Sequence, residues 1–372
     1  MKKILAGCAF ILIGFLIFGW AAAQEAEETK KIKDWTLLFY TCTDNNLESY
    51  TFRDFAKLTA SRIEGNAVSA CLLIDTQNLG SWHIVVDGNP YDDNTISMIR
   101  LENQDMSNLD TLIHFIRETA ENYPAKHYAL FFQGHGSGWY LKVEEDQLVS
   151  TAKIADAIEQ SGISFEIMGL DMCLMANIET AYEFRNLTKY IIASEDYGPW
   201  EGLVDPKILE QFSKETEPFN ILQFMARSFI KRNEIGEEND PADISIIATN
   251  QVEKLAEFLK QYENLFLSIE NLFGPKYAVD RSDTKPYYQL QDLYSLAKEA
   301  FAQNHAGWQN FEKLFYQIVI DYQQNKEKIS KPYAEYHHGL SIAVNGQNDD
   351  YDTNKTYREL RFPIRLESSG NN

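Results

Sequence analysis

The sequence predicts an α/β protein with a mainly parallel sheet, helices on both of its faces and a helical C-terminal extension. Short apolar runs of strand character alternate with segments of helical periodicity through about residue 250. Beyond that point helical periodicity predominates, and two strand-like runs interrupt it. Strand–helix alternation favours parallel pairing, because each helix carries the chain back across one face of the sheet.

Each expected strand of the first part is a short apolar run bounded by polar or turn-forming residues. These runs occupy residues 35–40, 68–75, 128–132, 165–170 and 190–193. Two further runs, at 82–86 and 95–99, flank a turn-rich segment at 87–90 and predict a hairpin. Helical periodicity covers residues 109–120, 151–160 and 176–184. We expect an α/β core over residues 35–250.

The second part contains more helical periodicity than strand. Helices are expected over residues 221–231, 251–269, 288–302 and 311–322. Apolar strands are expected at 244–248 and 340–344. We therefore expect residues 251–372 to form a helical extension that includes a returning strand and packs on the core.

The first 23 residues are typical of a secretory signal peptide. Two lysines precede an apolar run over residues 4–20, and three alanines precede Gln24. An uncleaved anchor is one alternative, but the run is short for a membrane span and contains glycines. Lipid attachment at Cys8 is another, but Cys8 lies before most of the apolar run. We expect export from a bacterial cell to the periplasm, surface or medium, with a polar leader over residues 24–34.

The composition excludes some partners. The chain has a formal net charge of −21 at pH 7, and loss of the signal peptide removes two lysines. No basic cluster with interleaved aromatic residues occurs, so nucleic acid is not expected as a partner. An acidic surface suits a cationic substrate or a divalent cation. Beyond the signal peptide, Cys42, Cys71 and Cys173 are too few and sparse for a disulfide framework, and we expect Cys42 and Cys71 to be buried thiols.

Two apolar runs end in side chains that can carry chemistry. One leads into Gly134-His135-Gly136-Ser137-Gly138, and the other into Asp171-Met172-Cys173. Segments that leave the carboxyl ends of parallel strands meet at one edge of the sheet, so His135 and Cys173 can pair as base and sulfur nucleophile. Taken alone, a glycine turn with an incidental histidine and an inert cysteine remain alternatives. The spacing of histidines and cysteines assigns no metal site.

Several motifs, in order along the chain, make the sequence similar to the clostripain family of cysteine peptidases, in the clan of caspases, gingipains and legumains. The resemblance covers about residues 35–345. Its motifs are Tyr40-x-x-x-Asp44-Asn45-Asn46-Leu47-Glu48, Gly134-His135-Gly136-Ser137-Gly138-Trp139, Leu170-Asp171-Met172-Cys173-Leu174-Met175 with Glu179 and Ala181-Tyr182-Glu183, Ala193-Ser194-Glu195 with Gly202, and Gly339-Leu340-Ser341-Ile342.

The resemblance implies a caspase-like sheet, a catalytic dyad of His135 and Cys173, and cleavage after Arg or Lys. It also implies that Asp171, two residues before the nucleophile, binds the basic side chain. A second acidic residue is expected after the next strand, and the candidates are Glu201, by spacing, and its rivals Asp196 and Asp205. The family sometimes binds calcium, which is possible here although the chemistry requires no cofactor.

The chain departs from the family pattern in two places. It has Gly202-Leu203-Val204-Asp205 where relatives often carry Gly-Trp-x-Tyr, and Lys142 is the single basic residue between 140 and 150, where many relatives are cleaved for activation.

These observations predict a secreted cysteine endopeptidase that acts on proteins or peptides. The amides of Gly136 and Cys173 would hold the oxyanion. The alternative is a catalytically silent surface relative that binds peptides or glycans.

Overall fold

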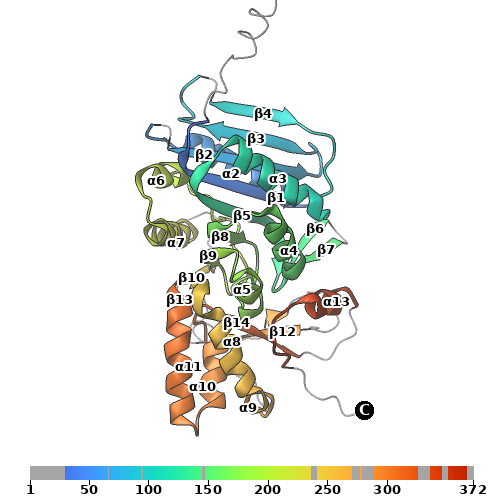
Figure 1. Cartoon of the computed structure of the whole chain (residues 1–372), viewed down its shortest axis with the longest axis vertical. Coiled ribbons are helices and arrows are strands. Elements are labelled where there is room, and N and C mark those ends of the chain that lie inside the picture. Colours follow the sequence, from blue (N-terminus) through green and yellow to red (C-terminus); the bar gives the residue numbers. More distant parts are fainter. Residues whose placement is uncertain are drawn as a thin grey trace, which may run out of the picture. The chain divides into compact units, whose positions relative to one another are not determined.

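The computed structural model describes residues 30–65, 67–93, 95–144, 147–235, 241–269, 277–278, 288–325, 336–345 and 351–366. The described residues from Lys33 onward belong to one compact unit, and Figure 1 labels most of its elements. The expected signal peptide, with Cys8 and the cleavage site before Gln24, lies outside the described residues. Within them, no helix combines the length and the apolar character that a membrane span requires.

Five parallel strands form the centre of the main sheet. β1 (Lys33–Thr43) pairs with β2 (Val68–Thr76) on one side and with β5 (Ala125–Ser137) on the other. β5 pairs with β8 (Phe165–Asp171), which pairs with β9 (Thr188–Ala193). Their apolar runs are buried on both faces, as parallel strands between two helical layers must be. The predicted mainly parallel sheet is confirmed.

Antiparallel strands extend both ends of this sheet. β3 (Trp82–Asp87) and β4 (Ile96–Arg100) form the predicted hairpin beside β2. At the other end, β10 (Asp243–Ala248) pairs with β9, and β13 (Val319–Gln324) pairs with β10. The sheet order is therefore β13-β10-β9-β8-β5-β1-β2-β3-β4.

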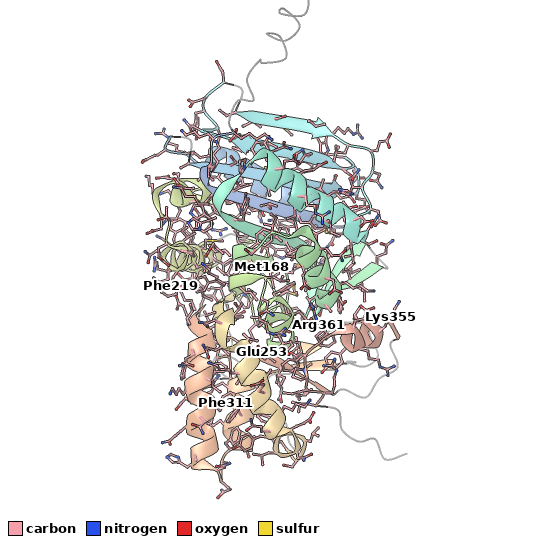
Figure 2. All side chains as sticks on the ribbon, in the orientation of Figure 1. Met168, Phe219, Glu253, Phe311, Lys355 and Arg361 are labelled. Atoms are coloured by element: carbon pink, nitrogen blue, oxygen red, sulfur yellow. The ribbon has the colours of Figure 1, made fainter. Side chains whose placement is uncertain are left out.

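Helices cover both faces of the sheet because successive strand side chains point to opposite sides. Leu38 and Tyr40 of β1 contact one apolar cluster, and Leu37 and Phe39 contact another. Figure 2 shows side chains filling these layers, with Met168 of β8 in the first cluster. The first face is covered by α3 (Leu109–Asn122), α4 (Thr151–Ser161), α5 (Ile178–Phe184) and α8 (Val252–Gln261). The second face is covered by α2 (Glu48–Ala60), α6 (Ile208–Lys214) and α7 (Pro218–Ile235).

Two expected helices have other bounds than predicted, and a strand replaces part of each. Residues 288–302 begin as β12 (Tyr288–Asp292), and α10 (Leu293–Ala300) starts where Asp292 accepts the amide hydrogen of Ser295 at 2.7 Å. α11 (His305–Ile318) ends where β13 begins to pair with β10. Helical periodicity in the sequence does not reveal either change, because both strands are stabilised by partners distant in sequence.

The part of the chain after residue 250 therefore contributes a strand to the main sheet. It also supplies a small antiparallel sheet of β11 (Tyr277–Ala278), β12 and β14 (Ser341–Asn345). The remaining short elements are the 3-10 turn η1 (Thr249–Gln251), α9 (Glu263–Leu267) and α13 (Tyr351–Glu359). A hairpin of β6 (Tyr140–Glu144) and β7 (Gln147–Ser150), which the sequence did not predict, follows β5.

Candidate active site

Adjacent parallel strands bring His135 and Cys173 to the same edge of the sheet. Gln133 of β5 is in register with Asp171 of β8. His135 lies two residues after Gln133, and Cys173 lies two residues after Asp171, both at the carboxyl ends of these strands. Both side chains line one cavity of about 760 Å³. The structure thus brings the two predicted dyad residues together, as the rule for strand ends led us to expect.

His135 is held by a side chain from the loop after β1. Its Nε2 lies 2.7 Å from Oδ1 of Asn46. With the amide in this orientation Nε2 carries the hydrogen, so Nδ1 is the basic nitrogen. Burial, together with nearby Lys142, lowers the pKa of His135 below its usual value. The imidazole is therefore neutral at pH 7 and able to accept a proton.

A glycine directly before His135 permits this placement. Gly134 has a φ angle of 146°, which side chains disfavour. A Cβ atom there would lie 2.5 Å from the carbonyl oxygen of Cys42 on β1. The close approach of β5 to β1 at this point therefore requires glycine.

The thiol of Cys173 is partly exposed, and an amide from a neighbouring loop contacts it. The amide of Gly198 donates a hydrogen bond to Cys173 Sγ at 3.3 Å. Leu174, the next residue, has a φ angle of 63°, in the left-handed region that bulky side chains rarely adopt. Its amide donates to the carbonyl of Asp196 at 3.0 Å. Strained backbone directly after a reactive side chain is typical of functional sites.

The loop that contacts Cys173 is fixed by buried carboxylates. Asp243 of β10 is fully buried and accepts the amide hydrogens of Glu195 at 2.9 Å and Asp196 at 3.1 Å. Oε2 of Glu195 accepts the amide hydrogen of Gly339 at 2.7 Å. Burial and the nearby Asp196 raise the pKa of Asp243 to about 7. These contacts connect the loop to β10 and to the segment before β14.

The cavity includes some of the predicted site residues and not others. His135, Gly136, Asp171, Cys173 and Asp196 line it. Glu201 and Asp205 are not among its lining residues.

Asp171 is one of the residues that line this cavity. Its Oδ2 accepts the amide hydrogen of Leu203 at 2.9 Å and a hydrogen of the Gln133 side-chain amide at 3.4 Å. Burial and the charge of Asp54 raise the pKa of Asp171 to about 6. A Cβ atom on Gly202 would lie 2.5 Å from Asp171 Oδ2, so this glycine leaves room for the carboxylate.

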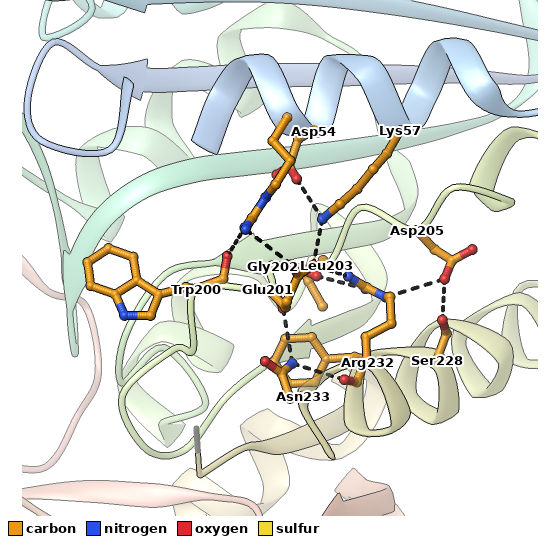
Figure 3. Close-up of polar contacts among 12 residues, drawn as sticks. Asp54, Lys57, Trp200, Glu201, Gly202, Leu203, Asp205, Ser228, Arg232 and Asn233 are labelled. Carbon is orange, nitrogen blue, oxygen red and sulfur yellow. Dashed lines mark hydrogen bonds and ion pairs between the residues drawn. The ribbon is translucent and has the colours of Figure 1, made fainter. Parts of the chain in front are cut away.

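Glu201, which does not line the cavity, lies in a network of cations (Figure 3). Arg53, Lys57 and Arg232 approach its carboxylate at 3.1, 2.9 and 3.3 Å. Burial opposes ionisation of Glu201, but Lys57 and the two arginines outweigh it and hold its pKa below the usual value. Asp205 is buried, accepts a hydrogen bond from Ser228 and lies 3.4 Å from Arg232 Nε.

Sequence reasoning missed the roles of Asn46 and Asp54. Asn46 follows β1 at the same sheet edge as His135, and this position in the sequence could have indicated that the two side chains lie close together. Asp54 lies within α2 and lines the cavity, which no local sequence pattern reveals. As for calcium, the described residues contain no group of three or more His, Cys, Asp or Glu side chains arranged to hold a metal ion.

Comparisons with known proteins agree with this arrangement. The profile of the clostripain family, Peptidase C11, matches residues 39–357. No curated protein sequence matches the chain. A secreted C11 cysteine protease from Bacteroides thetaiotaomicron, solved in complex with an irreversible peptide inhibitor, is similar with a TM-score of 0.70 and 16% identity. The match covers 88% of this chain and 99% of that one.

An inactive zymogen C11 protease from Parabacteroides distasonis has a TM-score of 0.68 and 19% identity, over 89% of this chain and 97% of its own. At such identities the likeness shows the fold, and the expected caspase-like architecture is confirmed. The family profile spans most of the chain, including both elements that carry His135 and Cys173. The chain belongs to the clostripain family, and it is a cysteine peptidase.

Proposed function

We propose that this protein is a secreted endopeptidase that cleaves after Arg or Lys through a dyad of His135 and Cys173. The observation that carries the proposal is that His135, Cys173 and the carboxylate of Asp171 line one cavity. A peptide seated there has a base, a nucleophile and a carboxylate within reach of one residue.

The chemistry follows from the state of each group. Nδ1 of His135 takes the proton of the Cys173 thiol, and the amide of Gly198 stabilises the thiolate by its hydrogen bond. The sulfur attacks the substrate carbonyl, whose oxygen becomes negative and is bound by the amides of Gly136 and Cys173. As the C–N bond breaks, His135 gives its proton to the leaving amine. Water then attacks the thioester, and the acid product leaves as the thiol regains its proton.

The acidic residues of the cavity support a preference for a basic side chain. Asp171 and Asp196 both line it. A buried carboxylate without a cation costs several kcal/mol of free energy, so a substrate ammonium or guanidinium group relieves that cost. We expect Asp171→Ala to lose about 2–5 kcal/mol of transition-state binding for Arg and Lys substrates.

Export is proposed from the sequence of residues 1–23. The charged start, apolar middle and alanine exit site are those of a signal peptide. The similar Bacteroides thetaiotaomicron protease is described as secreted. Mass spectrometry of the exported protein should give Gln24 as the first residue, and a lipid on Cys8 would contradict this assignment.

The dyad is tested by substitution. Cys173→Ala and His135→Ala should each abolish hydrolysis of a mixed peptide library and leave the fold intact, because thiolate and base act as one unit. The matched controls, Cys42→Ala and Cys71→Ala, remove buried thiols and should stay active. Turnover by the Cys173→Ala protein, with contamination excluded, would refute the mechanism. Cleavage sites without Arg or Lys would refute the specificity alone.

A further inference from the structure

A second carboxylate enters the cavity from helix α2. Asp54 lines the cavity together with Asp171, whereas Glu201 does not line it. We infer that Asp54 is the second carboxylate of the specificity pocket and binds the basic side chain of the substrate together with Asp171. This inference rests on the proposed function and adds to it a residue that determines specificity. Spacing in the sequence had suggested Glu201 for this role.

One glutamine amide joins the two carboxylates. Nε2 of Gln133 donates to Asp54 Oδ2 at 3.1 Å and to Asp171 Oδ2 at 3.4 Å. Oε1 of Gln133 accepts the hydroxyl hydrogen of Thr41 at 3.0 Å, which fixes the orientation of the amide. The two carboxylates thus share one donor, and they face the same cavity from α2 and from β8. This arrangement fits a substrate cation that carries several N–H groups.

The carboxylates in and around this pocket outnumber the cationic side chains that contact them by one. Lys57 lies 3.0 Å from Asp54 Oδ1 and 2.9 Å from Glu201 Oε2, so a single ammonium group serves both acids. Figure 3 shows this lysine between α2 and the segment that carries Glu201. Across the connected network, Arg53, Lys57 and Arg232 face Asp54, Asp171, Glu201 and Asp205. Three cations therefore meet four carboxylates, and a basic substrate side chain supplies the fourth.

The surroundings of Asp54 and Asp171 also favour binding of a further cation. Burial raises the pKa of Asp54, although Lys57 opposes the effect, and the nearby charge of Asp54 contributes to the raised pKa of Asp171. Two carboxylates close together in a poorly hydrated site repel each other until a cation binds. An apolar wall is close by, because Trp200, which is 41% exposed, stacks on Tyr50 at 4.8 Å between ring centroids. Both aromatic side chains line the cavity and suit the aliphatic stem of Arg or Lys.

Glu201 has a different task in this arrangement. Its side chain pairs with α2 through Arg53 and Lys57 and with α7 through Arg232, and its carbonyl accepts a hydrogen of Asn233 at 3.1 Å. It therefore joins its segment to α2 and α7 and acts on stability instead of on substrate choice.

The test measures binding of benzamidine, a small cation, and of neutral benzamide to the full mature chain carrying Cys173→Ala, by calorimetry. In that background Asp54→Asn should weaken benzamidine binding by roughly tenfold and leave benzamide binding unchanged. Asp54→Glu keeps the charge and should retain most of the affinity. The matched variant Glu201→Gln should keep benzamidine affinity within about twofold and lower the melting temperature.

Equal benzamidine affinity in Asp54→Asn and in its parent would overturn the assignment. So would a loss of affinity in Glu201→Gln alone, or a parent that does not distinguish the two probes. Circular dichroism shows whether Asp54→Asn is folded; if it is not, Asp54→Ser takes its place, with the same roughly tenfold loss of benzamidine affinity expected. The binding test needs no turnover, so absence of hydrolysis would refute the proposed function without deciding the role of Asp54.

Discussion

At the scale of single residues, Cys173 differs from the other described cysteines in its surroundings. Cys42 and Cys71 are buried, and burial raises the pKa of both thiols. Cys173 is partly exposed and accepts an amide hydrogen bond from Gly198. Since only a thiolate is nucleophilic, these differences predict different reactivity.

We expect iodoacetamide at pH 7 to alkylate Cys173 faster than Cys42 or Cys71 by about two orders of magnitude, because burial raises the pKa of those two thiols and keeps the reagent from them. Peptide mapping by mass spectrometry after timed quenching measures the three rates. His135→Ala should slow the reaction at Cys173 and leave the other two unchanged. Comparable rates at all three cysteines would contradict the assigned nucleophile.

The raised pKa of Asp171 predicts that cation binding depends on pH. Asp171, with a pKa of about 6, faces Asp54, Lys57, the Gln133 amide and the Leu203 amide. The carboxyl group ionises as pH rises through 6, so benzamidine affinity should rise between pH 5 and 7.5. Titrations across this range on the Cys173→Ala protein measure the effect. Asp171→Asn should flatten the profile, apart from a smaller rise as His135 loses its proton.

The same pKa has a consequence for stability. A carboxyl group whose pKa is raised on folding stabilises the fold fully below its unfolded value of 3.8, and that contribution is lost as pH rises through about 6. Asp171→Asn should therefore unfold at a higher urea concentration than the wild type at pH 7.5, and at a similar one at pH 4. A wild type that is more stable than Asp171→Asn at pH 7.5 would show that this carboxylate is paired.

At the scale of elements, the loop after β9 connects the nucleophile to the edge of the sheet. Asp243 accepts two amide hydrogens of this loop, and the amide of Gly198, in the same loop, donates to the thiol sulfur. The loop therefore positions an N–H group at Cys173 through contacts on β10.

Asp243→Ala leaves the amides of Glu195, which is buried, and Asp196, which is half-buried, without this acceptor, so we expect the free energy of unfolding to fall by about 2–5 kcal/mol. Urea denaturation measures this change. The alkylation rate of Cys173 should fall as well, because the Gly198 amide loses its fixed position. Asp92→Ala, at an exposed turn, is the control and should change stability by less than about 0.5 kcal/mol. Wild-type alkylation in a destabilised Asp243→Ala protein would limit Asp243 to a structural role.

At the scale of the whole molecule, buried carboxylates of the first part bind backbone or side-chain donors of the last part. Glu179 accepts the amide hydrogen of Ala343 at 2.9 Å, and Glu183 pairs with Nε of Arg361 at 2.7 Å. Glu195 binds the amide of Gly339, and β13 pairs with β10 in the main sheet. These contacts join described residues after 250 to the main sheet and to α5.

A chain truncated after residue 250 should therefore fail to unfold cooperatively. The truncated chain lacks β13, and the buried carboxylates of Glu179, Glu183 and Glu195 lose the hydrogen-bond donors described above. Thermal melts of residues 24–250 and of 24–372, followed by near-ultraviolet circular dichroism, compare the two. A cooperative melt of the shorter chain within a few degrees of the longer one would show that residues 24–250 fold without the rest, as the boundary expected at residue 250 implies.

The sequence alone determined the features that depend on local patterns. Alternating apolar runs and helical periodicity gave the α/β class, and the glycines around His135 and the strand before Cys173 placed both residues at strand ends. Parallel strands end at one edge, so convergence of the two followed without knowledge of contacts. Order and spacing of the motifs indicated the clostripain family.

Tertiary structure alone decided the features that depend on partners distant in sequence. β12 and β13 form because β14 and β10 pair with them, against a helical local pattern. Glu201 has the spacing of a substrate-binding acid, yet cations of α2 and α7 bind it, and Asp54 lines the cavity from a helix. Charge pairing depends on which surfaces pack together, and packing joins segments that no sequence window contains.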